Sequence, residues 1–127
     1  MSGARHPELR TGLRDLDKVV AEAQEEGFPR PSEEAVKNAR RLLRAMHRIS
    51  PQRFEVYPTP DGEVAIDAPG GAGRSVILLC GSDGGALCLV NMDGAHRRTR
   101  YSDTRRLPDG FVREALEELA QPDKHAA

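Results

Sequence analysis

A glycine-rich segment over residues 68–75 has the composition of a phosphate-binding loop. Such a loop has four residues between two glycines, ends in Lys-Ser or Lys-Thr, and leads into a helix whose first amides bind the phosphate. In this chain Ala68 stands at the first glycine position, Arg74 at the lysine position, and a strand-like apolar run follows. The segment therefore predicts a flexible loop in front of a β-hairpin and not a nucleotide site.

The two cysteines, Cys80 and Cys88, lie in apolar runs on either side of a Gly-Ser-Asp-Gly-Gly segment. A three-residue turn would set Cys80 opposite Cys88, whereas a two-residue turn at Asp83-Gly84 would set Cys80 against Leu87. No histidine shares the short spacing of a metal site. We therefore expect buried free thiols that pack as small hydrophobic side chains.

The histidines are far apart in the sequence, and none stands beside a Ser, Cys or carboxylate pattern that would make it a general base. They are His6, His47, His96 and His125. We expect no catalytic residue, no metal ligand and no cofactor, and the chain is predicted not to be an enzyme.

Arginine is concentrated in two segments, a predicted helix that begins after Ser32 and the strand and loop after Gly94. Helical residues three or four apart share one face, and arginine suits two-pronged contacts with carboxylates and phosphates. A charged helix face is normally solvated, and arginine on an edge strand hinders edge-to-edge pairing, so both clusters also have a purely structural explanation. The residues expected to contact a partner are Arg97, Arg98 and Arg100, followed by Arg41 and Arg44.

Two consecutive runs, 75–80 and 86–90, form the most apolar part of the chain. Successive strand residues point to opposite faces of a sheet, so a half-buried strand alternates apolar and polar residues. These runs do not alternate, because Ile77 and Leu79 place apolar side chains on one face while their even-numbered neighbours place apolar side chains on the other. Both faces of the hairpin therefore need cover. The chain has few long helices to supply it, which favours a partner surface.

The elements around this hairpin follow from periodicity. Apolar residues at helical spacing predict a helix from Pro7 to Gly27 and a second one that Ser32 caps. After Pro51 the period changes to two, and Asp-Gly pairs mark hairpin turns. The prolines of 58–60 cannot donate to a ladder, so the first strand is expected at the sheet edge.

The predicted fold class is α+β, with an N-terminal helical hairpin, a five-stranded antiparallel meander and a C-terminal helix. Residues 7–121 are expected to form a single α+β domain between a disordered N-terminus, 1–6, and a disordered tail, 122–127.

Composition excludes some classes of function. The net charge of −1 gives no global field to attract nucleic acid or an anionic membrane. Aromatic residues make up only 4% of the 127 residues, and without Trp the chain is poorly suited to stacking bases or sugars. No apolar stretch approaches the ~18 residues of a membrane span. With two cysteines and no signal-like start, a cytoplasmic location is expected.

The segment 57–67, Tyr-Pro-Thr-Pro-Asp-Gly-Glu-Val-Ala-Ile-Asp, follows two predicted helices and precedes the strand meander. It resembles a loose group of uncharacterised small bacterial proteins that often carry a Pro-x-Pro-Asp-Gly-Glu hairpin at this place, over residues 32–119. Members often end the second strand with an acid–Trp pair, where this chain has Asp67-Ala68. The resemblance implies a bacterial source and a role in antitoxin, immunity or inhibitor systems, and it carries over no catalytic residue.

We therefore expect a small non-enzymatic protein that acts by binding another protein, one with an acidic surface. The alternatives are a homodimer and a nucleic-acid-binding module that places the arginines of the second helix or fifth strand on phosphates. No membrane partner is expected.

Overall fold

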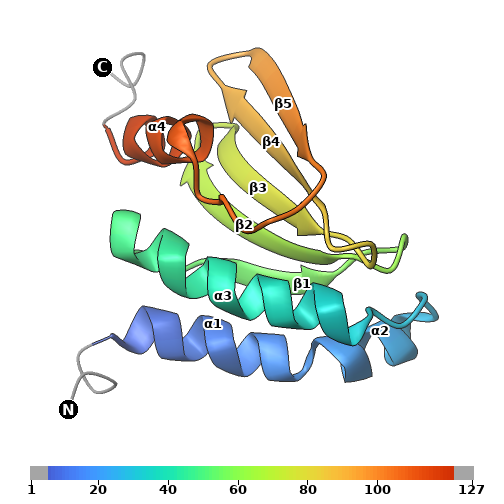
Figure 1. Ribbon diagram of the computed structural model, residues 1–127. Helices are drawn as coiled ribbons and strands as arrows, with labels where there is room; N and C mark the ends of the chain where they lie inside the picture. The colour runs from blue at the N-terminus through green and yellow to red at the C-terminus, as the bar shows by residue number, and fades with distance from the viewer. Residues whose placement is uncertain (1–5, 122–127) are drawn as a thin grey trace.

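Five antiparallel strands form one sheet whose spatial order follows the chain, β1-β2-β3-β4-β5 (Figure 1). The computed structural model describes residues 6–121, so most of the predicted disordered ends, 1–5 and 122–127, lies outside it. The elements are α1 (Pro7–Asp17), α2 (Val19–Glu26), α3 (Glu33–Ile49), β1 (Glu55–Pro58), β2 (Val64–Gly71), β3 (Arg74–Cys80), β4 (Ala86–Met92), β5 (Ala95–Tyr101) and α4 (Gly110–Leu119). This confirms the α+β class, the meander and the edge position of β1.

The predicted first helix is two helices that break at Lys18, whose φ of −99° and ψ of −3° form a turn. Asp17 before the break and the β-branched Val19 and Val20 after it are weak helix formers. The second predicted helix begins as expected, because the Ser32 hydroxyl accepts a hydrogen bond from the Ala35 amide at 3.0 Å.

One hydrophobic core lies between the helices and one face of the sheet. In β3 and β4 every second residue is buried on this face, and the helices close over it. The largest fully buried side chains are Phe54, Leu16, Leu42, Leu43, Met46, Ile66, Leu78 and Leu116.

The glycine-rich segment is not the flexible loop that the sequence predicted. β2 continues to Gly71, and a tight turn at Ala72 and Gly73, with φ of 52° and 77°, leads into β3. A Cβ built on Gly70 would lie 2.2 Å from Cδ1 of Leu119, so a glycine here lets α4 approach the strand.

Both expected pairings of the two cysteines are wrong. Cys80 lies opposite Ala86, and Cys88 lies opposite Leu78. The turn holds five residues, 81–85, because the Gly81 amide bonds to the Gly85 carbonyl at 3.0 Å and Asp83 accepts from the Gly85 amide at 2.9 Å. The expectation of buried free thiols is confirmed.

Arg74, at the start of β3, is only 6% exposed and holds the end of α4. Its Nη2 donates to the Glu118 carbonyl at 2.7 Å and its Nη1 to the Gln121 carbonyl at 3.1 Å. Carbonyls at a helix C-terminus carry partial negative charge and have no partner within the helix, so a buried cation stabilises them.

Replacing Arg74 should therefore loosen α4. We expect Arg74→Ala to lower the free energy of unfolding by about 2–4 kcal/mol, because two charge-assisted hydrogen bonds and a buried side chain are lost. Urea denaturation followed by circular dichroism measures this change. Arg113→Ala, at an exposed site on α4, is the control and should change stability by less than about 0.5 kcal/mol. Equal effects of the two substitutions would contradict this role for Arg74.

Candidate functional site

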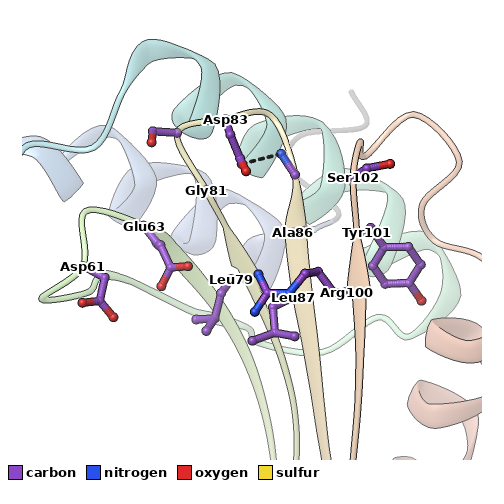
Figure 2. A pocket seen from close by; sticks show the side chains of 12 residues that line it. Asp61, Glu63, Leu79, Gly81, Asp83, Ala86, Leu87, Arg100, Tyr101 and Ser102 are labelled. Atoms are coloured by element: carbon purple, nitrogen blue, oxygen red, sulfur yellow. Dashed lines mark hydrogen bonds between the residues drawn. The ribbon is translucent and has the colours of Figure 1, made fainter.

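The face of the sheet opposite the helices is called the open face here, because no other element of residues 6–121 lies on it. Figure 2 views the sheet from this side and shows helices behind the strands. Burial follows the same division, since the residues of β3 and β4 alternate between buried and half-buried along both strands.

Four half-buried side chains form an apolar stripe along the middle of the open face. Ile77 lies opposite Leu89, and Leu79 lies opposite Leu87, on neighbouring strands. Ala65 lies beside Leu79 on β2 and is fully buried. The helices supply the cover that the sequence predicted for one face. The open face has no cover from residues 6–121, and cover by a partner stays a prediction.

Carboxylates lie on the β1–β2 side of the stripe. Asp67 lies opposite Glu55 of β1 on one side and Ile77 of β3 on the other. The Tyr57 hydroxyl donates to Oδ2 of Asp67 at 3.0 Å, and burial together with this carboxylate raises the pKa of Tyr57 to about 12. Sequence reasoning missed this acidic side, although the two-residue period of β1 and β2 already puts Glu55, Tyr57 and Asp67 on one face.

Cationic side chains lie on the opposite side of the stripe. Arg98 lies opposite Leu89 and Arg100 opposite Leu87, so both arginines of β5 stand on the open face and both are exposed. The open face is therefore acidic along one side, apolar in the middle and basic along the other.

A shallow hollow of about 680 Å³ occupies one end of the open face (Figure 2). Leu79 and Leu87 line it together with Asp61 and Glu63 from the β1–β2 turn and Arg100 from β5. The hollow thus combines an apolar lining with charges of both signs.

The arginines expected to form one partner site are divided between the two faces of the sheet. Arg97 lies opposite Val90 on the helix face, with its guanidinium carbon 5.6 Å from the centre of the Phe111 ring. Arg98 and Arg100 lie on the open face because side chains alternate along β5. Exposed Arg44 is on α3, on the helix side of the sheet.

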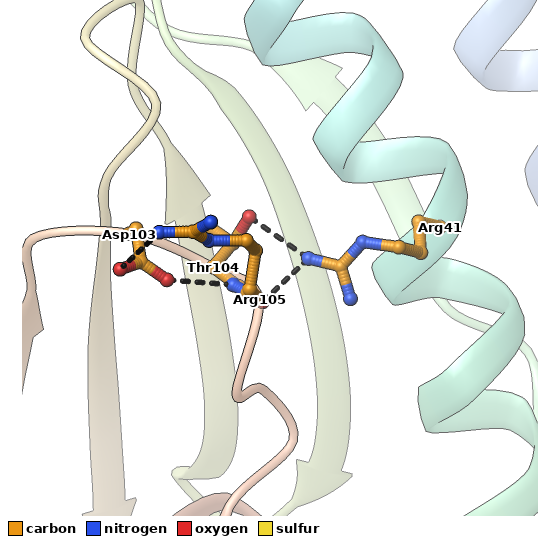
Figure 3. Close-up of polar contacts among 4 residues, drawn as sticks. All are labelled: Arg41, Asp103, Thr104 and Arg105. Atoms are coloured by element: carbon orange, nitrogen blue, oxygen red, sulfur yellow. Dashed lines mark hydrogen bonds and ion pairs between the residues drawn. The ribbon is translucent and has the colours of Figure 1, made fainter.

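Arg41, also expected at the partner site, holds the loop after β5 to α3 (Figure 3). Its guanidinium donates to Oγ1 of Thr104 at 2.8 Å, to the Thr104 carbonyl, and to the Leu107 carbonyl at 3.3 Å. Nearby, Asp103 pairs with Arg105 at 3.6 Å. The contacts of Arg41 give it a structural role.

The titratable groups with clear pKa shifts have structural causes. Burial raises the pKa of Cys80 and of Cys88 to about 12, so both thiols are protonated at neutral pH. Burial lowers the pKa of His47, with a further contribution from His6, whose ring centre is 5.3 Å away, and Glu8 opposes the shift. Burial also raises the pKa of Tyr101, whose hydroxyl donates to Asp109.

Within residues 6–121 no group of three or more His, Cys, Asp and Glu side chains is placed to hold a metal ion. No helix in the same range is long and apolar enough to cross a bilayer. Comparisons with protein-family models, curated proteins and solved structures gave no match. The resemblance to the small bacterial group stays a prediction.

Adjacent leucines of β3 should report the difference between the two faces. We expect Leu78→Ala to cost about 3 kcal/mol of unfolding free energy, because a fully buried side chain leaves a cavity. Leu79→Ala on the open face should cost about 1 kcal/mol, since its side chain is half-exposed already. Denaturation of dilute protein measures both, and equal losses would show that the open face is covered.

The thiols should be unreactive in the folded protein. At pH 8 we expect neither Cys80 nor Cys88 to react with a thiol reagent, because each is buried and protonated far below its raised pKa. Both should react on adding denaturant. The reaction is monitored by absorbance, and rapid labelling of one thiol in the native protein would contradict the prediction.

Proposed function

We propose that this protein acts by protein–protein binding through the open face and carries out no catalysis of its own. The observation that carries the proposal is the apolar stripe, four half-buried side chains side by side with no cover from residues 6–121. A contiguous apolar patch with a polar rim is typical of an interaction site. The narrower class, an antitoxin, immunity or inhibitor protein, comes from the resemblance alone.

The charges beside the stripe support a protein partner with a defined orientation. Charged rims steer encounter and reject partners that bring like charges together, while the apolar centre supplies most of the affinity. A partner must place an acidic group near Arg98 or Arg100 and a basic group near Asp67. This refines the expectation of a partner with an acidic surface, because only one side of the open face is basic.

The arrangement gives less support to nucleic-acid binding, the alternative function. Phosphate binding needs a continuous basic surface. Here Arg97 and Arg98 point to opposite faces, Arg41 is engaged with a loop, and carboxylates share the open face with Arg98.

The proposal that the protein is not an enzyme is supported by the surroundings of its perturbed groups. Tyr57 is bound to Asp67, Tyr101 to Asp109, and both thiols are buried on the helix face. A reaction centre would bring such groups together around one hollow.

A double substitution in the stripe, Leu79→Glu with Leu87→Glu, tests the proposed function. The tagged native chain and the variant are each used to capture proteins from cells that express the protein. We expect the captured proteins to be lost with the variant, because two carboxylates enter the apolar centre of the interface. Arg44→Glu on α3 is the control and should keep them.

Two results would contradict the proposal. One is capture of the same proteins by the stripe variant, which would place binding elsewhere. The other is loss of all captured material after nuclease treatment, which would favour the nucleic-acid alternative.

A further inference from the structure

We infer that a second copy of this chain covers the open face, in a two-fold pair with sheet packed on sheet. The inference rests on the proposed function and names the partner. It is carried by the order of residues across the sheet, in which acidic, apolar and basic positions follow one another from β2 to β5.

Two rows of paired residues run across the open face. The first row passes from Asp67 through Ile77 and Leu89 to Arg98. The second passes from Ala65 through Leu79 and Leu87 to Arg100. Glu63, which lines the hollow with Arg100, adds a carboxylate at the β2 end of the face.

A two-fold axis parallel to the strands, between β3 and β4, makes this pattern complementary to itself. The axis places β3 over the partner's β4 and β2 over the partner's β5, with each row facing the same row. Asp67 then faces the partner's Arg98, and Ile77 faces the partner's Leu89. A two-fold axis across the strands would instead bring carboxylate over carboxylate. Charge therefore selects the first arrangement, and each contact occurs twice because such an interface is isologous.

Two groups on this face lack partners in the single chain. Oδ1 of Asp67 is buried and accepts no hydrogen bond from residues 6–121, although Oδ2 is bound to Tyr57. Arg98 takes part in none of the ion pairs between described residues. A paired copy would place Arg98 of the partner subunit beside the Asp67 carboxylate, and the partner's Asp67 beside Arg98. The small net charge of −1 adds little repulsion between copies.

The size of the face sets the expected affinity. Four strands about 4.8 Å apart, with about seven residues of about 3.3 Å each, span roughly 450 Å² of projected surface. A standard interface buries about 800 Å² on each partner. We therefore expect a reversible dimer with a Kd in the micromolar range, visible only when the protein is concentrated.

Complementary charge reversals test the inference with purified full-length protein. Asp67→Arg alone brings arginines against Arg98 of the partner subunit, and Arg98→Asp alone brings carboxylates against the partner's Asp67. We expect each variant to weaken the dimer tenfold or more. An equimolar mixture should form a heterodimer, because both symmetry-related contacts then join opposite charges. Sedimentation equilibrium from about 1 µM to about 500 µM spans the expected Kd.

Matched variants keep the test specific. Arg97→Asp makes the same charge change at the neighbouring position of β5, but on the helix face, and should leave the dimer unchanged. Should Asp67→Arg fail to fold, as circular dichroism would show, Asp67→Asn removes the charge at the same position with little change in size. We expect Asp67→Asn to weaken the dimer as well, because Arg98 of the partner subunit then faces no carboxylate.

A native chain that stays monomeric up to about 500 µM overturns the inference. So does a dimer that both single reversals leave intact, or a mixture of folded variants that fails to associate. None of these results decides the proposed function. A monomer whose stripe variant still loses its captured proteins would retain the open face as a site for a different protein.

Discussion

The alternation of side chains along β3 and β4 is the constraint on which the rest of the structure depends. Each residue of these strands points either toward the helices or away from them. The chain provides apolar side chains in both directions, but the helices of residues 6–121 all pack on the same side, in one core. Stability is therefore built on the even-numbered residues of β3, and the odd-numbered Ile77 and Leu79 stay available for contacts outside the chain.

The last helix lies on this same side because three residues, each distant from it in the sequence, hold the helix and its connecting loop. Gly70 leaves room for Leu119, Arg74 binds the final carbonyls of α4, and Arg41 binds the loop that precedes the helix. Asp109 joins the loop to the helix, since it accepts from the Val112 amide at 3.1 Å and from the Tyr101 hydroxyl. Arg74 and Arg41 thus donate hydrogen bonds to backbone carbonyls, whereas the arginines of β5 stay exposed.

The sequence was sufficient for the elements and their order, because periodicity and turn residues are local signals. Ser32 as a helix cap, Gly27 as a helix end and the turn at Asp93-Gly94 all lie where expected. The break at Lys18 was missed because the apolar spacing continues through it. The cysteine pairing was wrong because hydrogen bonds within residues 81–85 set the length of the turn, and side-chain types alone do not fix them.

The candidate site was only partly predictable, for a different reason. That the hairpin is apolar on two faces can be read from the order of its residues. Which face the helices cover, and on which side of the sheet each arginine falls, depends on contacts between distant segments. Arg41 seemed equivalent to Arg44 on the helix, yet only Arg41 meets the loop at Thr104. Asp67 lies across the apolar stripe from the basic strand β5, and this arrangement exists only once all five strands are in register.

The two outer strands limit how many copies can assemble. β1 has four residues and ends in Pro58, which has no amide to donate, and β5 carries arginines on both of its faces. Neither strand offers a good template for another strand, so growth of the sheet into a fibre is discouraged. In the pairing we propose, the open face of each copy is used up in one contact, so the expected assembly is closed and finite.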